Sequence, residues 1–428
     1  MKLPQVHPQR LQLNNEVHAR PPMALHPNQR LSYLALMSDP AFSEQEWRRV
    51  RDLAEHFGKS IPHGPSNHCR IDMGPFQLTF ERHAEFARYT IVADGVGDNP
   101  FDNPALALLP EDWVAQLPGQ LMVATHAAVV PAPSRSRDYD RISKTLFDGN
   151  TLIGAMIGGG AGTALTDMRV RGDGFSRLLI EDRSMTARQA GRYVQRLLEI
   201  DTYRIMALLA LPVAQHQRPF LQTFEQELEQ VTTAMASAQE KDEPVLLDRL
   251  TRLAAEIEHR YSASHFRFSA ASAYYALVEN RIDELREERL PGLQTFGEFT
   301  ARRLEPAMNT CQAIAARHEA LSERMARATQ LLSTRVEITS ERQSQALLES
   351  MDRRAKLQLR LQQTVEGLSI AAITYYVVGL VGYAAKGLNA MGLGINSDLV
   401  MGLSIPAVAI LAWFGIGRLR RWFKDSKP

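Results

Sequence analysis

Three side chains suited to binding a metal ion alternate along one short segment of the sequence. Glu81, His83 and Glu85 are two residues apart, so an extended chain would place them on the same side. Imidazole and carboxylate groups are common ligands of divalent metals, which makes these three residues the metal candidates. A half-exposed strand with its polar face in water explains the same alternation without a metal. We favour this second interpretation and expect no bound cofactor.

Two other local patterns resemble binding motifs but lack residues or spacing that those motifs require. The run Gly158–Gly162 reads GGGAG, but it lacks the Lys and the Ser or Thr of a phosphate-binding loop, and it lies between two strand-like runs. We therefore expect a hairpin turn there. His63, His68 and Cys69 share one predicted loop, but they do not have the paired spacing of zinc ligands.

The sequence also lacks the motifs of common hydrolases. It contains neither a G-x-S-x-G nucleophile elbow nor an H-E-x-x-H helix. The two cysteines, Cys69 and Cys311, are far apart in the sequence and do not form the spacing pattern of a disulfide framework. So few cysteines are typical of a protein in a reducing compartment. The 49 basic and 48 acidic residues leave a net charge of +1, which argues against a nucleic-acid partner. We predict a protein that is not an enzyme and has no catalytic residues.

The predicted secondary structure changes near residue 185, from mainly strands to helices. Before that point, short apolar runs predict strands, together with one helix from Glu44 to Phe57 that begins with a capping box of Ser43 and Glu46. The predicted strands are 31–37, 76–83, 86–93, 120–130, 152–157, 163–170 and 177–181, and residues 131–140 are predicted to form a polar loop. We expect residues 1–185 to form a mixed α/β domain in the cytoplasm.

Helical periodicity dominates from residue 186 onward. Predicted helices at 186–211, 219–241 and 244–289, with a shorter one that ends near Glu305, make up a helical bundle over residues 186–306. The next segment, 307–367, has neither Gly nor Pro before Gly367, a run of roughly 60 residues, and is predicted to be one stalk helix about 90 Å long.

Apolar side chains recur along the stalk at steps of three and four residues and form a seam on one helix face. The seam residues are Met308, Cys311, Ala315, Leu321, Met325, Ala328, Leu332, Val336, Leu347, Met351, Ala355, Leu361, Val365 and Leu368. Cys311 is therefore expected to have a packing role. A helix of this length must bury its seam against the preceding helices or against sister chains, and we expect a homo-oligomer formed through the stalk.

Two uncharged apolar stretches follow, at 368–385 and 399–417. Each approaches the ~20 residues that a helix needs to cross a bilayer, so residues 368–417 are predicted to form a transmembrane hairpin with the lipid bilayer as partner. Basic residues flank both outer ends of the hairpin, whereas the loop between the two spans has one charge of each sign. The flanking residues are Arg353, Arg354, Lys356 and Arg360 before it, and Arg418, Arg420, Arg421, Lys424 and Lys427 in the tail 418–428. This asymmetry predicts that both termini are cytoplasmic.

Several distinctive segments resemble a known family. The segment LNNEVHARPP at 13–22, which includes Asn15, Glu16, His18, Arg20 and Pro21, is the most distinctive of them. The others are FERHAEF at 80–86, LPEDWVAQLPG at 109–119, AGRYVQRLLEIDTYRIMALLALP at 190–212 and LQLRLQQTVEGLSIAAITYYVVGL at 357–380. Together they resemble a bacterial family of membrane-anchored proteins described as a domain of unknown function (DUF3422). The resemblance implies a bacterial inner-membrane location and brings no activity, substrate or catalytic residue.

A looser likeness is architectural. A cytoplasmic domain, a stalk helix that continues into the first of two spans, and a basic inner tail are together similar to the CorA-type divalent-cation channels, in which the first span lines the pore and ends in Gly-Met-Asn. The loop here, KGLNAMGLGINSD, lacks that signature and has Asp398 as its only acid. The likeness implies an alternative function, an ion channel or transporter with Ser369, Thr374, Gly379 and Asn389 lining a central pore.

The sequence therefore predicts an α+β membrane protein with an N-terminal mixed α/β domain, a helical stalk and a C-terminal two-helix transmembrane hairpin. The favoured function is that of a membrane-anchored, self-associating protein with a structural or regulatory role.

Overall fold

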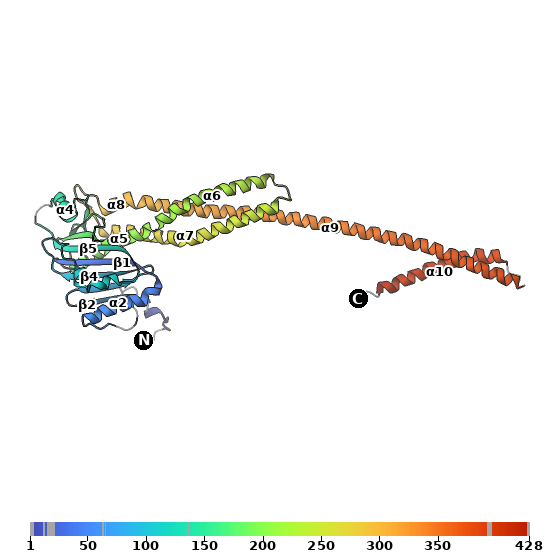
Figure 1. Ribbon diagram of the computed structural model, residues 1–428, viewed down its shortest axis with the longest axis horizontal. Coiled ribbons are helices and arrows are strands. Elements are labelled where there is room, and N and C mark those ends of the chain that lie inside the picture. The colour runs from blue at the N-terminus through green and yellow to red at the C-terminus, as the bar shows by residue number, and fades with distance from the viewer. Residues whose placement is uncertain are drawn as a thin grey trace. The chain divides into compact units, whose positions relative to one another are not determined.

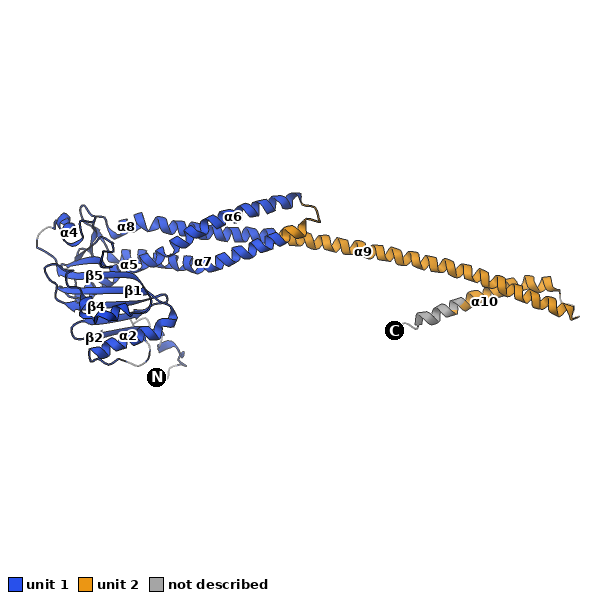
Figure 2. Ribbon diagram, viewed as in Figure 1, with its two compact units in different colours: residues 1–237, 248–329 blue, residues 238–247, 330–428 orange. Residues whose placement is uncertain are grey.

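The computed structural model describes residues 4–11, 13–14, 22–61, 64, 66–134, 137–391 and 396–425, without the side chains of 416–417 and 419–425. The chain divides into two compact units (Figure 2). Unit 1 comprises residues 1–237 and 248–329, and unit 2 comprises residues 238–247 and 330–428. The predicted combination of an N-terminal sheet with long C-terminal helices is confirmed.

Unit 1 is built on a sheet that contains nine strands within the described residues (Figure 1). In spatial order these are β2 (His68–Asp72), β3 (Gln77–Arg82), β4 (Phe86–Asp94), β1 (Gln29–Met37), β5 (Gln120–Pro131), β8 (Ser176–Asp182), β7 (Gly162–Thr166), β6 (Ile153–Ile157) and β9 (Glu288–Arg289). The β5–β8 pair is parallel, and the other described pairs are antiparallel.

All seven strands predicted from the sequence are present, but two further strands were not predicted. β2 alternates Cys69 and Ile71 with polar residues but has only five residues, and β9 has only two residues, which are held in the sheet by pairing with β6. The predicted loop at 131–140 is too long, because β5 extends to Pro131 and helix α4 (Tyr139–Leu146) begins where the Asp138 carboxylate accepts a hydrogen bond from the Arg141 N–H. The glycine-rich run forms the predicted turn between β6 and β7.

One face of the sheet is apolar and is covered by short helices. Helix α2 (Ser43–His56) places Trp47 and Leu53 in a buried cluster with Leu34, Phe80 and Tyr89 from three neighbouring strands. The helices η2 (Ala105–Leu108) and α3 (Glu111–Ala115) contribute to the same cluster, and α4 lies over a second cluster beside β7 and β8. Because side chains alternate along a strand, the residues between these apolar positions face the opposite side.

That opposite side is covered by α5 (Ala187–Leu208), which begins with a capping box of Thr186 and Gln189. The Tyr33 hydroxyl of β1 bonds to the Thr202 hydroxyl of α5 at 2.8 Å, and both side chains are buried. This interface between the sheet and α5 contains polar and charged side chains, in contrast to the apolar face under α2.

Three helices of unit 1 pack side by side after α5 (Figure 1). They are α6 (Ala210–Ser237), the part of α7 (Glu243–Leu285) that follows residue 247, and the part of α9 (Glu305–Ala390) up to residue 329. The Arg317 guanidinium of α9 makes two hydrogen bonds to the Glu225 carboxylate of α6, and the Arg260 guanidinium of α7 lies 3.8 Å from the Phe220 ring centroid of α6. Cys311 is buried in this bundle, as its predicted packing role requires.

Several predicted helix boundaries were wrong, among them the end of the helix at 244–289, which stops at Leu285 because residues 288–289 form β9. α6 does not begin at Pro219 but continues through it, and the burial of Ala214 before it and Leu221 after it offsets the backbone hydrogen bond that proline cannot make. α9 follows α8 (Phe296–Arg303) and begins at Glu305 rather than 307, since Pro306 occupies its first turn, where no N–H donor is needed.

Unit 2 contains the remainder of α9, which runs without a break through Gly367 to Ala390, and α10 (Ser397–Asp425). The Arg335 guanidinium of α9 pairs with the buried Glu243 carboxylate at the start of α7, with 2.7 Å between Nη2 and Oε1. α9 and α10 meet at Gly382, where an added Cβ would overlap the Met401 side chain. Residues 392–395 of the predicted outer loop lie outside the described residues.

Candidate functional site

The two carboxylates proposed as metal ligands are each held by an arginine. Glu81 lies on β3 and accepts a hydrogen bond from the Nε of Arg88, which follows it across the hairpin on β4. Glu85 lies in the turn between these strands and accepts hydrogen bonds from both terminal nitrogens of Arg267, at 2.8 and 3.1 Å. Each carboxylate therefore already has a cationic partner within its own chain.

The third candidate, His83, stacks on the Phe86 ring with 4.4 Å between the ring centroids. Within the part of the chain that the structure describes, no three His, Cys, Asp or Glu side chains group in a way that could hold a metal ion. The structure thus does not bring Glu81, His83 and Glu85 together as a ligand set. Cys69 faces the apolar core, and burial raises the pKa of its thiol to about 11, while His63 lies outside the described residues.

A buried cluster of charged side chains occupies the interface between the sheet and α5. We call Glu81, Arg88, Glu199 and Arg281 the charge cluster. The guanidinium of Arg88 bonds to Glu81 on β3 and, at 3.0 Å from Nη1 to Oε1, to Glu199 on α5. The other oxygen of Glu199 accepts a hydrogen bond from Arg281 of α7 at 2.5 Å. The cluster therefore ties two strands to α5 and α7.

The electrostatics of the cluster favour the ionised form of every member. Burial alone would raise the pKa of Glu81, but the charge and hydrogen bond of Arg88 outweigh burial and leave the pKa below its ordinary value. Glu199 behaves in the same way, because burial is outweighed by the charges of Arg88 and Arg281, which lower its pKa. Both carboxylates are thus ionised at neutral pH and face two guanidinium groups, which do not titrate.

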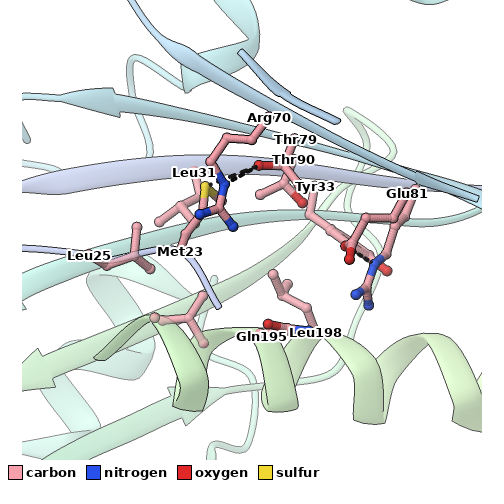
Figure 3. A pocket seen from close by; sticks show the side chains of 13 residues that line it. Met23, Leu25, Leu31, Tyr33, Arg70, Thr79, Glu81, Thr90, Gln195 and Leu198 are labelled. Carbon is pink, nitrogen blue, oxygen red and sulfur yellow. Dashed lines mark hydrogen bonds and ion pairs between the residues drawn. The ribbon is translucent and has the colours of Figure 1, made fainter. Parts of the chain in front are cut away.

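A small cavity lies beside the charge cluster (Figure 3). Arg70, Thr79 and Thr90 line it from the sheet, and Gln195 and Leu198 line it from α5. Its volume of about 40 Å³ is enough for about three water molecules. No group in the cluster is poised to exchange a proton near neutral pH, so this arrangement is suited to holding the sheet and helices together.

The charge cluster could not have been found by local sequence patterns. Glu199 is 111 residues from Arg88 and 82 from Arg281, and neither arginine belongs to a recognisable motif. The alternation of Glu81 with His83 and Glu85 is the local signal in the sequence, and it predicts a strand face exposed to water. In the structure the Glu81 side chain is buried. This interpretation was wrong because α5 covers the polar face of β3.

The chain that leads into β1 packs directly on α5. The Leu25 N–H donates to the Ala187 carbonyl at 2.9 Å, and a Cβ at Gly191 would overlap the backbone carbonyl oxygen of Met23. Gly191 is thus required for the close approach of these two segments. The family-motif residues Asn15, Glu16, His18, Arg20 and Pro21, which precede this segment, lie outside the described residues.

The four residues predicted to line a pore all lie on α9 and are spread around it. The hydroxyl groups of Ser369 and Thr374 donate to carbonyl groups of the preceding turn, at 2.8 and 2.7 Å. Since successive helix residues are about 100° apart, Thr374 lies about 140° from Ser369, and Gly379 lies about 80° from Ser369 in the opposite direction. Asn389 lies about 60° from Thr374, so the four residues do not share one face.

Both stretches predicted to span a membrane form helices that are long and apolar enough to do so. They lie in the C-terminal part of α9 and in residues Ser397–Gly415 of α10. In the most apolar window, 17% of the residues are buried in α9 and 0% in α10. Arg418 is exposed within α10, while the side chains of Arg420, Arg421 and Lys424 lie outside the described part.

Comparison with known proteins agrees with the motif resemblance. Among curated proteins, no sequence matches the chain. A family model described as "Protein of unknown function (DUF3422)" matches residues 5–423, which include both the charge cluster and the two apolar helices. The chain therefore belongs to the DUF3422 family.

Proposed function

We propose that this protein is anchored in a bacterial inner membrane by a helical hairpin made of the C-terminal part of α9 and of α10. Unit 1 then lies in the cytoplasm and has a structural or regulatory role without catalysis of its own. In this proposal the chain associates with further copies of itself through α9.

The observation that carries the proposal is the exposure of many large apolar side chains along two helices. A core helix of a water-soluble protein buries its apolar face, and large apolar patches exposed to water are rare. In the described part of the hairpin, the exposed side chains include Leu368, Tyr375, Tyr376, Leu380, Tyr383, Leu399, Leu403, Leu411, Trp413 and Phe414. A hydrocarbon environment explains this exposure, and the aromatic residues suit the interfaces of a bilayer.

The orientation of the hairpin follows from its flanking charges. Arg353, Arg354, Lys356 and Arg360 precede the first apolar stretch, and basic residues from Arg418 onward follow the second. The excess of basic residues on the cytoplasmic side of membrane proteins therefore supports cytoplasmic termini and a short outer turn.

The absence of catalysis in this proposal is supported by the chemistry of the charge cluster. Its two carboxylates are ionised and each is bound by at least one arginine. The cavity beside it is of the size of a few water molecules, whereas pockets for small-molecule substrates are several times larger. This chemistry suits a framework that holds α5 and α7 on the sheet.

The CorA-like channel remains the alternative prediction. It requires polar groups of the first span to converge on one axis, and the spread of Ser369, Thr374, Gly379 and Asn389 around α9 does not favour it. Flux of a divalent cation through liposomes that contain the purified chain, and its loss on replacement of Thr374 and Asn389, would favour the channel over the anchored framework.

Extraction of bacterial membranes with alkaline carbonate tests the anchor. We expect the full-length chain to stay in the membrane pellet, because carbonate releases peripheral proteins but leaves bilayer-spanning helices in place. Recovery of the intact chain in the soluble fraction without detergent would contradict the proposal.

A further inference from the structure

One stretch of α9 exposes apolar side chains before the proposed membrane span begins. Leu347, Met351, Leu361, Val365 and Leu368 have exposed fractions between 56% and 74%. No residue from 340 to 369 is buried, so within the described residues no other element of the chain covers this stretch. It differs in this respect from α9 up to residue 332, where most residues of the predicted seam are buried.

The spacing of these residues is that of a coiled coil. Residues 347, 351, 354, 358, 361, 365 and 368 are separated by alternating steps of four and three, which are the a and d positions of successive heptads. We call these seven positions the heptad seam. Five of them are apolar, and Arg354 and Gln358 form a polar interruption at the centre.

Charged residues are kept away from the heptad seam. Between residues 347 and 368, Arg354 is the only charged residue at an a or d position, and the flanking e and g positions carry none. The other charges are at positions b, c and f, on the far side of the helix: Glu349, Asp352, Arg353, Lys356, Arg360 and Glu366. Two ion pairs, Arg353–Glu349 and Lys356–Asp352, run along that outer side. Apart from Arg354, the seam therefore presents an uncharged face to an identical face.

We propose that the heptad seam of α9 pairs with the same seam of a second copy in a parallel coiled coil. This inference rests on the proposed function, because anchoring in one membrane gives every copy the same direction and the same height. In that arrangement each seam residue faces its own counterpart, so the surface is complementary to itself. Arg354 faces Arg354 of the second copy, and the repulsion between these two like charges lowers the stability of the pair.

Single cysteines in membranes test the pairing. In the full-length C69S/C311S chain, Leu361→Cys at a d position places two thiols within disulfide distance, whereas Gln363→Cys at an f position points them apart. Mild oxidation of isolated membranes should give a covalent dimer severalfold more abundant for Leu361→Cys than for Gln363→Cys. Equal cross-linking at both positions, or none at either, would overturn the proposal.

A second pair of variants examines the polar interruption. Arg354→Leu removes the only charge from the seam, so it should increase cross-linking of the Leu361→Cys chain, whereas Arg353→Leu at an outer position should leave cross-linking unchanged. A decrease with Arg354→Leu would contradict the parallel arrangement.

Carbonate extraction of the same samples separates this inference from the anchor. A chain that stays in the membrane but does not cross-link refutes only the pairing, and a soluble chain refutes the anchor.

Discussion

The two units treat charged and apolar side chains in opposite ways. Unit 1 buries Glu81, Arg88 and Glu199 and pairs them with one another and with the half-buried Arg281, while unit 2 leaves leucine, tyrosine and tryptophan side chains exposed along α9 and α10. Burying a charge is costly unless a partner compensates it, and exposing large apolar surface to water is costly as well. Unit 1 satisfies the first condition by pairing its buried charges, and in the proposed function lipid would cover the exposed apolar side chains of unit 2.

The largest expected effect concerns the charge cluster of unit 1. Arg88→Met leaves the buried carboxylate of Glu81 without its arginine, and breaking a buried ion pair in this way costs about 3–5 kcal/mol. Urea unfolding of the detergent-solubilised chain measures the loss. The double variant Arg88→Met, Glu81→Gln should recover part of it, because no unpaired charge then remains at that pair.

Arg353→Met is the matched control in unit 2. Its ion pair with Glu349 is exposed on both sides, so its removal should leave the urea midpoint unchanged. A similar loss for Arg353→Met and Arg88→Met would show that burial of the cluster does not matter.

The next effect distinguishes exposure to water from exposure to lipid. Leu411 and Val170 are exposed to nearly the same degree, 71% and 73%, but Leu411 lies in the proposed span and Val170 lies in a loop of unit 1. Leu411→Arg should disfavour membrane insertion by about 2.5–3.5 kcal/mol and shift the chain out of carbonate-washed membranes. Val170→Arg should not alter the share of the chain that stays in the carbonate-washed membranes. If neither substitution changes this share, both sites face water.

A smaller effect is expected where residues 22–25 meet α5. Gly191→Ala forces a Cβ into the Met23 carbonyl, and overpacking of this kind costs about 1–3 kcal/mol. Gly172→Ala is the control, since a Cβ there meets nothing within 4 Å. Urea titrations of the two variants should differ in midpoint, and coincident curves would mean that the N-terminal segment does not need this contact.

The smallest effect is a dependence of stability on acid. The pKa values of Glu81 and Glu199 are lowered in the folded state, so their stabilising contribution is complete above the unfolded value of about 4.3 and is lost as the pH falls through the lower folded values. The melting temperature of unit 1 should therefore fall below about pH 4. Glu199→Gln should flatten this decline, and an unchanged slope would exclude Glu199 as its source.

The sequence predicted those parts of the fold that depend on local periodicity. The short apolar run at 31–37 and the regular apolar spacing in 186–211 identified β1 and α5, since each pattern is set within a few residues. β9 was missed because two residues carry no pattern, and the charge cluster was missed because Glu199 and Arg281 come from helices far along the chain. The structure does not bring the three metal candidates together as a ligand set, since Arg88 from the same hairpin binds Glu81 and Arg267 from α7 binds Glu85.

The proposed function requires the α9–α10 hairpin to cross the bilayer, and the accessibility of single cysteines measures this crossing. In the C69S/C311S background, Asn389→Cys lies near the proposed outer turn and Ser340→Cys lies on the proposed cytoplasmic side. A maleimide that cannot cross the inner membrane should label Asn389→Cys in intact cells, and should label Ser340→Cys only after the inner membrane is disrupted. Labelling of both cysteines only after disruption would show that the hairpin does not cross the membrane.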